Sequence, residues 1–418
     1  MTVLRVPRRF ESIVQLYLDR LRKDGYGWLL GRVLKRVAAW TAWLLLLPAT
    51  VLLHLAGLRR VTVFTDRIGH LAGELDCFVK QQRLGKLPSR RWFVLAPERR
   101  VANRCLLDYW ARHVTIITSP LLCGLLGIMS RRWLLVYDIS RYMLRPARCE
   151  YYATFAEWGE RPPILELTEA DRAAGRAMLE SMGVPKGAWF ACVHAREAGF
   201  SPVDEVLHAH RNGDVGRLIP AIEFITSRGG WCVRMGDPSM KALPPMRSVV
   251  DYAHHPARSP RMDVFLCASC RLFVGNSSGL FIVASCFGVP SALANMIPAS
   301  AFGYSPRDLS IVKLLRRRGA ADYIGFAEAF GPVVSDYRIA SQFESAAIEL
   351  EENSAQDILE LVQEALGVLE GRGGLDEADA ARARALHALL FADHYACAAG
   401  SRLGAAFLRK YQRLLDRK

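Results

Sequence analysis

Acidic residues are scarce in this chain of 418 residues. Asp and Glu together number 41 against 55 Lys and Arg, which gives a formal net charge of +14 at neutral pH. A balance this basic favours anionic partners: phosphates, nucleic acid or an acidic membrane surface. The chain does not interleave aromatic residues with Lys and Arg, as a platform for single-stranded nucleic acid would need. We therefore expect no nucleic-acid partner.

Signs of a disulfide framework or a metal site are also missing. The ten cysteines are scattered, and 51% of the residues are apolar. A chain of this length can bury a core without disulfides, so we expect reduced thiols in the cytosol. No Asp-x-Asp motif follows an expected strand, and the Cys267/Cys270 pair has no second pair beside it. We therefore expect no metal ion and no cofactor.

Charge is absent from Val37 to Leu58, a stretch that would extend about 33 Å as a helix. The residues before it are rich in Lys and Arg, with apolar side chains at three- and four-residue steps, which predicts a basic amphipathic helix. A membrane-crossing helix would carry this basic arm to the outer side, against the usual charge bias. The uncharged segment is therefore expected to dip into one leaflet, bent at Pro48 and with both flanks on the cytosolic side, and the alternative is a helix buried on the main body.

Runs of apolar residues alternate with helical patterns in two successive sets. Continuous apolar strands in such an alternation predict parallel sheets covered by helices on both faces. The expected fold class is α/β, with two Rossmann-like domains facing a cleft. We expect a membrane-associated segment at 1–60, an acceptor domain at 61–165, a donor domain at 166–340 and C-terminal helices at 341–418. The expected strands are Val61–Phe64, Trp92–Ala96, Val114–Thr118, Leu134–Tyr137, Trp189–His194, Trp231–Met235, Val249–Tyr252 and Arg271–Gly275.

Three of the expected strands in the second set end in residues suited to binding phosphate. The most telling end is Gly275–Gly279, where Asn276, Ser277 and Ser278 stand at the start of a helix whose free N–H groups would face an anion. Gly279 would let the ligand approach the backbone, so Ala there should weaken diphosphate binding without lowering the melting temperature. An ordinary helix cap is the alternative. The other ends carry His194 with Arg196, and Arg234 with Gly236, where the alternative is a surface ion pair.

A second polar group lies on the first strand–helix turn. Arg67 and Gly69 precede His70 and Glu74, which are four residues apart and so share a helix face. They could act as base and orienter or form a domain-interface pair. Farther along, the polar loop 208–214 contains Arg211 and Asn212 and could be a lid over the site, or simply an N-cap at Asn212.

Several of these segments together resemble a family of bacterial glycosyltransferases that occur with surface-polysaccharide genes. The family is distantly similar to fucosyltransferase-like enzymes of the GT-B architecture, and the similarity runs from about residue 60 to residue 370. The segments that carry it are Arg67–Glu74, His194–Arg196, His210–Asp214, Arg234–Gly236, Gly275–Gly279 and Ala284–Pro290.

The resemblance implies that His194 and Arg196 hold a nucleoside diphosphate, together with Ser277 and Ser278. It also shows a departure: where the fucosyltransferase group has an acidic residue, this chain has Gly199, and the next carboxylate after Glu197 is Asp204. The nucleotide base and the catalytic base therefore stay open.

The expected function is a metal-independent GT-B glycosyltransferase that uses a nucleotide-sugar as co-substrate. It would transfer the sugar to a glycan or lipid-linked acceptor in surface-polysaccharide synthesis, as a peripheral or monotopic protein on an anionic membrane surface at the cytoplasmic face of the inner membrane. Arg196, Arg234 and the turn at 277–279 would stabilise the leaving diphosphate, and His70, Glu74 or Asp204 would supply the base. The alternatives are a nucleotide-sugar epimerase of the same architecture and a basic membrane- or nucleic-acid-binding adaptor without catalysis.

Overall fold

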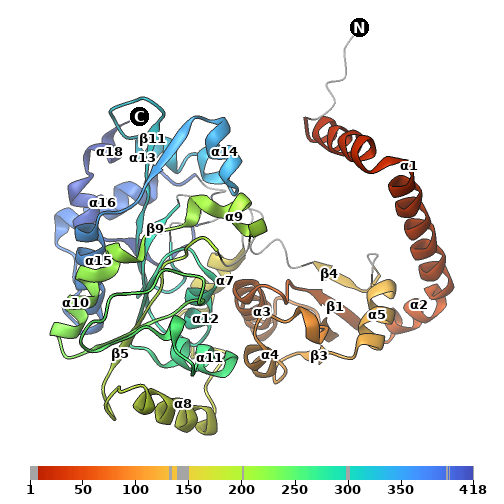
Figure 1. Ribbon diagram of the computed structural model, residues 1–418, viewed down its shortest axis with the longest axis horizontal. Helices are drawn as coiled ribbons and strands as arrows, with labels where there is room; N and C mark the ends of the chain where they lie inside the picture. Colours follow the sequence, from red (N-terminus) through yellow and green to blue (C-terminus); the bar gives the residue numbers. More distant parts are fainter. Residues whose placement is uncertain are drawn as a thin grey trace. The chain divides into compact units, whose positions relative to one another are not determined.

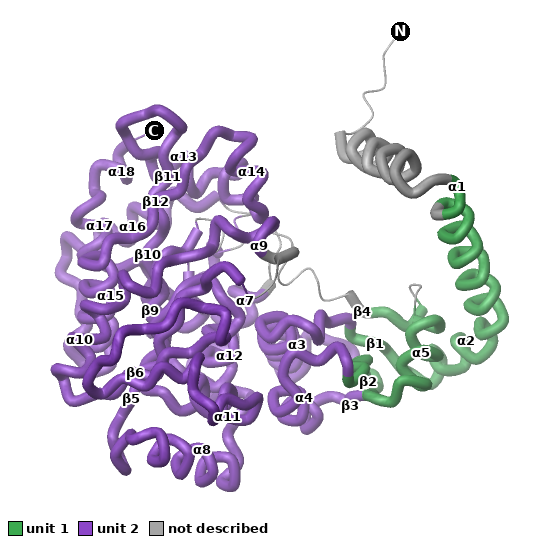
Figure 2. Tube along the Cα trace, viewed as in Figure 1, with its two compact units in different colours: residues 1–61, 90–98, 117–137 green, residues 62–89, 99–116, 138–418 purple. Residues whose placement is uncertain are grey.

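The computed structural model describes residues 8–130, 134–138, 150–199, 202–297, 302–391, 394 and 396–417 (Figure 1). Within these ranges, the side chains of residues 8–25, 28, 137, 138, 150 and 202–204 are not described. The chain divides into two compact units, each described here by itself (Figure 2). Unit 1 consists of Met1–Val61, Arg90–Glu98 and Ile117–Tyr137, and unit 2 of Thr62–Ser89, Arg99–Ile116 and Asp138–Lys418.

Most of a four-stranded sheet with the order β3-β2-β1-β4 belongs to unit 1, although two of the three residues of β3 belong to unit 2. Its strands are β1 (Leu58–Thr62), β2 (Arg91–Leu95), β3 (Thr115–Ile117) and β4 (Val136–Asp138), and all four were expected from the sequence. The expected start of β1 at Val61 is wrong, because Leu58 already pairs in parallel with Arg91. Arg59 and Arg60 fit into the strand because they donate to the His54 carbonyl and to Ser130 Oγ respectively. A boundary after residue 60 would therefore cut an inner strand.

Unit 1 has three helices: α1 (Arg8–Leu45), which carries no charge from Val37 onward, and the uncharged α2 (Leu47–Leu55) and α5 (Pro120–Met129). The break between α1 and α2 falls at Leu46, just before Pro48, whose ring removes a backbone donor. No single described helix is long and apolar enough to cross a bilayer. Leu29–Leu45 and Leu47–Leu55 meet that criterion only as a pair bent by 53°.

Unit 2 is organised around a seven-stranded sheet with the order β13-β10-β9-β8-β5-β6-β7, whose described pairings are all parallel. The inner strands are buried along their whole length, as expected for a sheet covered on both faces. The α/β class is thereby confirmed. The strands are β5 (Phe190–Val193), β6 (Trp231–Arg234), β7 (Val249–Val250), β8 (Leu272–Gly275), β9 (Ser291–Met296), β10 (Leu309–Val312) and β13 (Arg402–Leu403).

Helices lie on both sides of this sheet. Figure 1 shows α10 (Ile219–Ser227) and α15 (Ala355–Leu369) on one side, and α11 (Pro260–Ser269) and α12 (Gly279–Cys286) on the other. Helix α15 begins with a capping box: Asp357 N–H donates to Ser354 Oγ at 3.2 Å, and Ser354 N–H to Asp357 Oδ2 at 3.1 Å.

The two α-helices between β1 and β3 belong to unit 2. Helix α3 (Ile68–Arg83) packs on α12, and α4 (Arg104–Trp110) packs on α11. The division therefore differs from the expected acceptor domain at 61–165, whose segments are shared between the two units. Every residue of α3 from Leu71 to Gln81 is buried, so this helix has neighbours all around it.

The remaining elements complete unit 2. Strands β11 (Leu314–Arg317) and β12 (Ile348–Glu351) form a separate antiparallel pair. The helices are α7 (Glu150–Trp158), α8 (Glu169–Ser181), α9 (Pro202–His208), α13 (Phe326–Ala329), α14 (Ala340–Ser345), α16 (Glu377–Ala388), α17 (Ala405–Lys410) and α18 (Arg413–Asp416).

Candidate active site

The N-termini of α3 and α12 meet within unit 2. A Cβ placed on Gly69 would lie 2.9 Å from Gly279 Cα, and one placed on Gly279 would lie 2.8 Å from Gly69 N. Neither Arg67 nor Ser278, the two N-cap residues, caps its helix with a side-chain hydrogen bond. The first turns of both helices therefore carry N–H groups without intrahelical acceptors, and the positive ends of two helix dipoles converge.

The role expected for Gly279 changes accordingly. Its missing side chain makes room for α3, since a Cβ at this position would also lie 2.7 Å from Ile68 Cγ2. These distances predict that Ala at 279 lowers the melting temperature, against the expectation from the sequence that it would not. Close packing against α3, which sequence reasoning did not detect, is the physical reason.

His70 and Glu74 interact as their spacing predicted. His70 Nδ1 lies 2.8 Å from Glu74 Oε1, and the imidazole also packs edge-on against Phe64 with ring centroids 5.1 Å apart. The Glu74 side chain is buried, whereas 24% of the His70 side chain remains exposed. With Nδ1–H donated to the carboxylate, Nε2 is the ring nitrogen left to accept a proton. This pair sits on the first turns of α3, directly after the Gly69 contact.

Arg196 follows β5 and is held by the segment 205–212. Its Nη1 donates to the His208 carbonyl at 3.2 Å and to Asn212 Oδ1, and it lies 3.8 Å from Glu205 Oε2. The Arg196 N–H donates to Asn276 Oδ1 at 3.0 Å, which ties the end of β5 to the turn after β8. Asn212 therefore positions Arg196 and does not cap a helix. The N-cap function expected for it belongs to Asp214, whose Oδ1 accepts from Gly216 N–H at 2.9 Å.

Arg211 links the same loop to the turn before α12. Its Nε and Nη2 donate to the Ser277 carbonyl at 3.1 and 2.6 Å, while Asn276 Nδ2 donates to the Arg211 carbonyl at 3.1 Å. Ser278 is buried, and its Oγ has no hydrogen-bond partner among the described residues. The predicted residues 196, 211, 212 and 276–279 are thus gathered at the carboxyl ends of β5 and β8.

Sequence reasoning missed Lys313 as a residue of this cluster, whereas His210 belongs to the polar loop 208–214 that was expected as a lid. Lys313 directly follows β10, is buried, and donates from Nζ to the Asn212 carbonyl at 2.6 Å. Burial lowers its pKa, as does nearby Arg217, whereas Glu352 opposes the shift. His210 is also buried, and neither ring nitrogen has a hydrogen-bond partner among the described residues. The sequence signal that could have found Lys313 is a lysine inside the apolar run 309–315.

The cationic surroundings affect the buried histidines. Burial lowers the pKa of His210 to about 3, with further contributions from the charges of Arg211 and Lys313. Burial likewise lowers the pKa of His194 to about 4, although the Met235 carbonyl, 3.0 Å from Nδ1, partly opposes it. Both imidazoles are therefore neutral at pH 7, and His194 donates its Nδ1 proton to that carbonyl.

At the predicted strand end, Arg234 and Gly236 contact neighbouring protein residues. The Arg234 side chain is fully buried and donates to Glu197 Oε2 at 3.2 Å, to Asp251 Oδ1 at 3.3 Å and to the Lys241 carbonyl at 2.9 Å. Two carboxylates already neutralise the guanidinium, so it joins the loops that follow β5, β6 and β7. A Cβ on Gly236 would lie 2.6 Å from Met240 Sδ, so this glycine too serves packing.

Of the other predicted site residues, Arg67 is exposed at the N-cap of α3. Asp204 belongs to α9, but its side chain lies outside the described ones. Among the residues that the structure describes, no three His, Cys, Asp or Glu side chains are grouped so that they could hold a metal ion.

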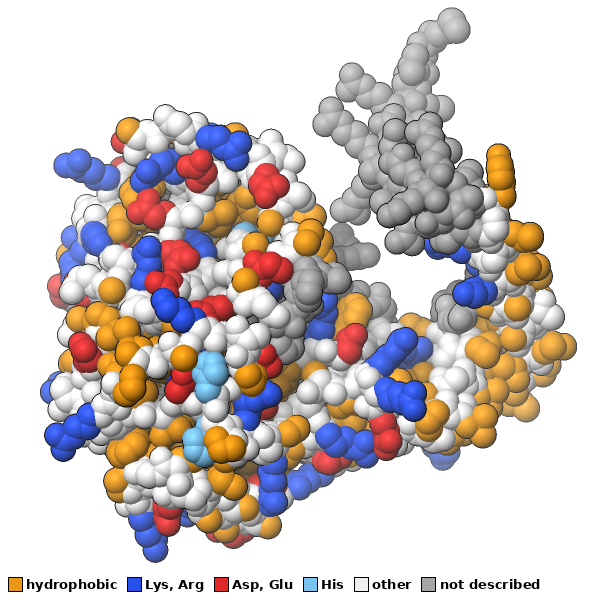
Figure 3. Space-filling view, in the orientation of Figure 1, with side chains coloured by type: hydrophobic (Ala, Val, Ile, Leu, Met, Phe, Trp, Pro, Cys, Tyr) orange, Lys and Arg blue, Asp and Glu red, His pale blue; other side chains and the backbone are white. Residues whose placement is uncertain are grey.

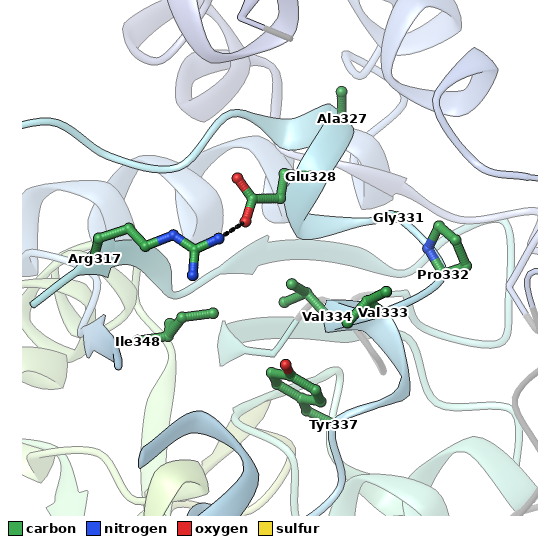
Figure 4. Close-up of a pocket in the computed structure, with 9 residues that line it drawn as sticks. All are labelled: Arg317, Ala327, Glu328, Gly331, Pro332, Val333, Val334, Tyr337 and Ile348. Atoms are coloured by element: carbon green, nitrogen blue, oxygen red, sulfur yellow. Dashed lines mark hydrogen bonds and ion pairs between the residues drawn. The ribbon is translucent and has the colours of Figure 1, made fainter. Parts of the chain in front are cut away.

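A pocket of about 370 Å³ lies near this cluster but contains none of the predicted residues (Figure 4). The Tyr337 ring at its wall packs edge-on against Phe343 at 5.2 Å, and Phe343 lies 5.3 Å from the His210 ring. The pocket is lined by Arg317, Ala327, Glu328, Gly331, Pro332, Val333, Val334, Tyr337 and Ile348.

Comparisons with known proteins find similarity only at the level of solved structures, since no family profile and no curated protein matches the chain. A glycosyltransferase of family 9 from Veillonella parvula DSM 2008 is 17% identical over 58% of this chain and 66% of that one, with a TM-score of 0.28. The ADP-heptose lipopolysaccharide heptosyltransferase II of E. coli is 15% identical over 56% and 84%, with a TM-score of 0.39. The iron-containing dodecameric glycosyltransferase TibC from enterotoxigenic E. coli H10407 is 14% identical over 75% and 76%, with a TM-score of 0.40.

The chain spans just under two thirds of the Veillonella protein's length. With identities below 20% and TM-scores of 0.40 or less, the function is argued from the residues of the site alone.

Proposed function

We propose that this protein is a GT-B-type glycosyltransferase that uses a nucleotide-sugar donor and needs no metal ion. The observation that carries the proposal is the convergence of two uncapped helix N-termini beside a cluster of cations in unit 2. Gly69 and Gly279 bring the helix starts together, and Arg211 is bonded to the turn before one of them. In this proposal a nucleoside diphosphate is the anion that the cluster receives.

The charge balance of the cluster favours a diphosphate. Arg196, Arg211 and Lys313 contribute three cations around the 205–212 segment, and Glu205 is the carboxylate that lies nearest to Arg196. A buried ammonium without a directly bonded carboxylate is costly, so an anionic ligand would stabilise Lys313 in its charged form. The same groups would oppose the negative charge that grows on the departing β-phosphate, which is the main electrostatic demand of this reaction.

His70 is proposed as the general base that removes the proton from the acceptor hydroxyl. Glu74 fixes the ring orientation through Nδ1 and favours the imidazolium that forms when Nε2 takes the proton. The partly exposed ring follows directly on the Gly69 contact, so the base would stand beside the proposed diphosphate site. The acceptor is proposed to be a glycan or lipid-linked sugar of a surface polysaccharide, as the family resemblance implies.

The donor half is tested by calorimetric titration with nucleosides, nucleoside monophosphates and nucleoside diphosphates. The diphosphates should bind most tightly, and Arg211→Ala and Lys313→Met should each weaken them about 10- to 100-fold, the scale of one or two charge-assisted hydrogen bonds. Arg384→Ala is the matched control, because Arg384 is an exposed arginine of α16 paired with Glu377. Equal binding of nucleosides and diphosphates would contradict the proposal.

The chemistry is tested by product analysis with labelled nucleotide-sugars and by His70→Gln. This variant should lower kcat by about 10²- to 10⁴-fold while leaving diphosphate affinity unchanged. Glu74→Gln should lower kcat less and shift its pH profile. If Asp66→Asn abolishes turnover and His70→Gln does not, the base is misassigned, since Asp66 is an exposed carboxylate on the same turn. An isomerised sugar nucleotide formed without acceptor would identify an epimerase.

A further inference from the structure

Exposed apolar side chains are concentrated on three helices of unit 1. Of the twenty large apolar residues that are exposed in the described part of the chain, fifteen lie on α1, α2 and α5. Figure 3 shows hydrophobic side chains gathered over α1 and α2. The fifteen are Tyr26, Leu29, Leu30, Val33, Leu34, Val37, Trp40, Leu44, Leu45, Val51, Leu52, Leu55, Leu121, Leu122 and Leu125.

Helix α5 is the new element in this surface. It lies more than sixty residues beyond α2 in the sequence, yet it contacts α1, and its last turn is tied to the sheet because Arg60 Nη1 donates to Ser130 Oγ at 2.9 Å. Its Leu121 is 79% exposed, which is more than almost any other apolar residue described. The helix contains no charged residue. An apolar patch of this extent on a folded unit marks an interaction surface.

The charge around the patch identifies its partner. From Gly25 to Thr65 the sequence contains no Asp or Glu, and none occurs from Tyr109 to Tyr137. The described basic side chains of unit 1 are Arg32, Lys35, Arg36, Arg59, Arg60, Arg90 and Arg91, and Glu98 is the acidic one described there. A second copy of the same face would bring like charges together, whereas an anionic bilayer offers both an apolar interior and opposite charge.

The lengths of the helices define how the surface meets the bilayer. Helix α5 has ten residues and α2 nine, so neither reaches beyond about 15 Å, half of a hydrocarbon core. The bend of 53° turns α2 away from the direction of α1, and basic residues lie at both ends of the apolar stretch. Exposed Tyr26 and Trp40 are residue types that favour the interface between lipid and water.

We propose that α1, α2 and α5 together form one monotopic membrane-binding surface that enters a single leaflet of an anionic bilayer. The proposal does not depend on the glycosyltransferase assignment, because every residue it uses lies in unit 1 and every residue of the proposed donor site lies in unit 2.

The test is co-sedimentation of the full-length protein with vesicles of phosphatidylglycerol and phosphatidylcholine, or of phosphatidylcholine alone. The triple variant Leu121→Ser/Leu122→Ser/Leu125→Ser should bind the anionic vesicles at least about tenfold more weakly. The matched control is Met178→Ser/Val206→Ser/Val333→Ser, which removes three exposed apolar side chains of unit 2 and should bind like wild type. Lys35→Glu/Arg36→Glu should weaken binding to the anionic vesicles only.

Two further measurements keep the outcomes separate. The circular dichroism spectrum of the triple variant should match that of the wild type, which shows that the variant is folded. Its affinity for diphosphate should also be unchanged, which shows that the donor site is intact. Wild-type binding by the triple variant would overturn the role of α5. Sedimentation velocity without lipid tests self-association. If the wild type is an oligomer and the triple variant a monomer, while both bind vesicles equally, the surface is a self-association face and the proposal is wrong.

Discussion

Gly279→Ala tests the contact between the two helix starts. The added methyl group would lie 2.7 Å from Ile68 Cγ2 and 2.8 Å from Gly69 N, distances at which the α3 backbone must shift. Overpacking of this kind costs about 1–3 kcal/mol, and the better helix propensity of Ala recovers less than about 1 kcal/mol. The net loss of about 1–2 kcal/mol should lower Tm by about 1–3 °C, because a unit of this size has a large entropy of unfolding.

The matched control is Gly367→Ala in α15, where an added Cβ meets nothing within 4 Å. That change should raise the stability by up to about 1 kcal/mol, because only the propensity term remains. Gly69→Ala should resemble Gly279→Ala, since its Cβ would lie 2.9 Å from Gly279 Cα, and the double variant should cost less than the sum of the two. Differential scanning calorimetry gives all four values. A Gly279→Ala protein that melts at or above the wild-type temperature would refute the close packing.

Two other predictions concern stability. The pKa values of His194 and His210, about 4 and about 3, lie below the usual 6.5, so the unfolded state binds more protons than the folded state as the pH falls below 6.5. Each histidine should therefore lower the free energy of unfolding by about 1–2 kcal/mol between pH 7 and pH 5. His210→Phe should make the free energy of unfolding, measured by denaturant titration, depend less on pH. Arg234→Met should lower the free energy of unfolding by about 3 kcal/mol, because Glu197 and Asp251 lose the guanidinium that they pair with. At a temperature where the variant is folded, its affinity for diphosphate should stay within twofold of wild type. A large loss of affinity would return Arg234 to the donor site.

The sequence predicted the strands better than the tertiary role of the residues at their ends. Apolar runs located β5, β6 and β8 within a residue or two, because a buried parallel strand needs a continuous apolar stretch. Strand β9 was missed because Ser291–Met296 contains no β-branched residue. Without β9 and β10, Lys313 could not be placed at the same end of the sheet as Arg196.

Two predicted site residues have contacts that the sequence did not reveal, for one physical reason. Arg234 was interpreted as a phosphate ligand because its partners, Glu197 and Asp251, come from loops that only the fold brings to it. Gly279 was interpreted through the helix it starts, while its constraint comes from α3, some two hundred residues earlier. By contrast, the contact between His70 and Glu74 could be predicted, because four-residue spacing on one helix fixes it locally.

The short joint between α2 and β1 determines how unit 1 would behave at a surface. Only Ala56 and Gly57 separate the helix from an inner strand, and the joint is braced where Arg59 donates to the His54 carbonyl at 3.0 Å. A flexible tether would let a docked protein swivel and change its height above the lipid. Here any tilt of α2 also tilts the sheet, so docking of α2 would fix the orientation of unit 1 relative to the lipid surface.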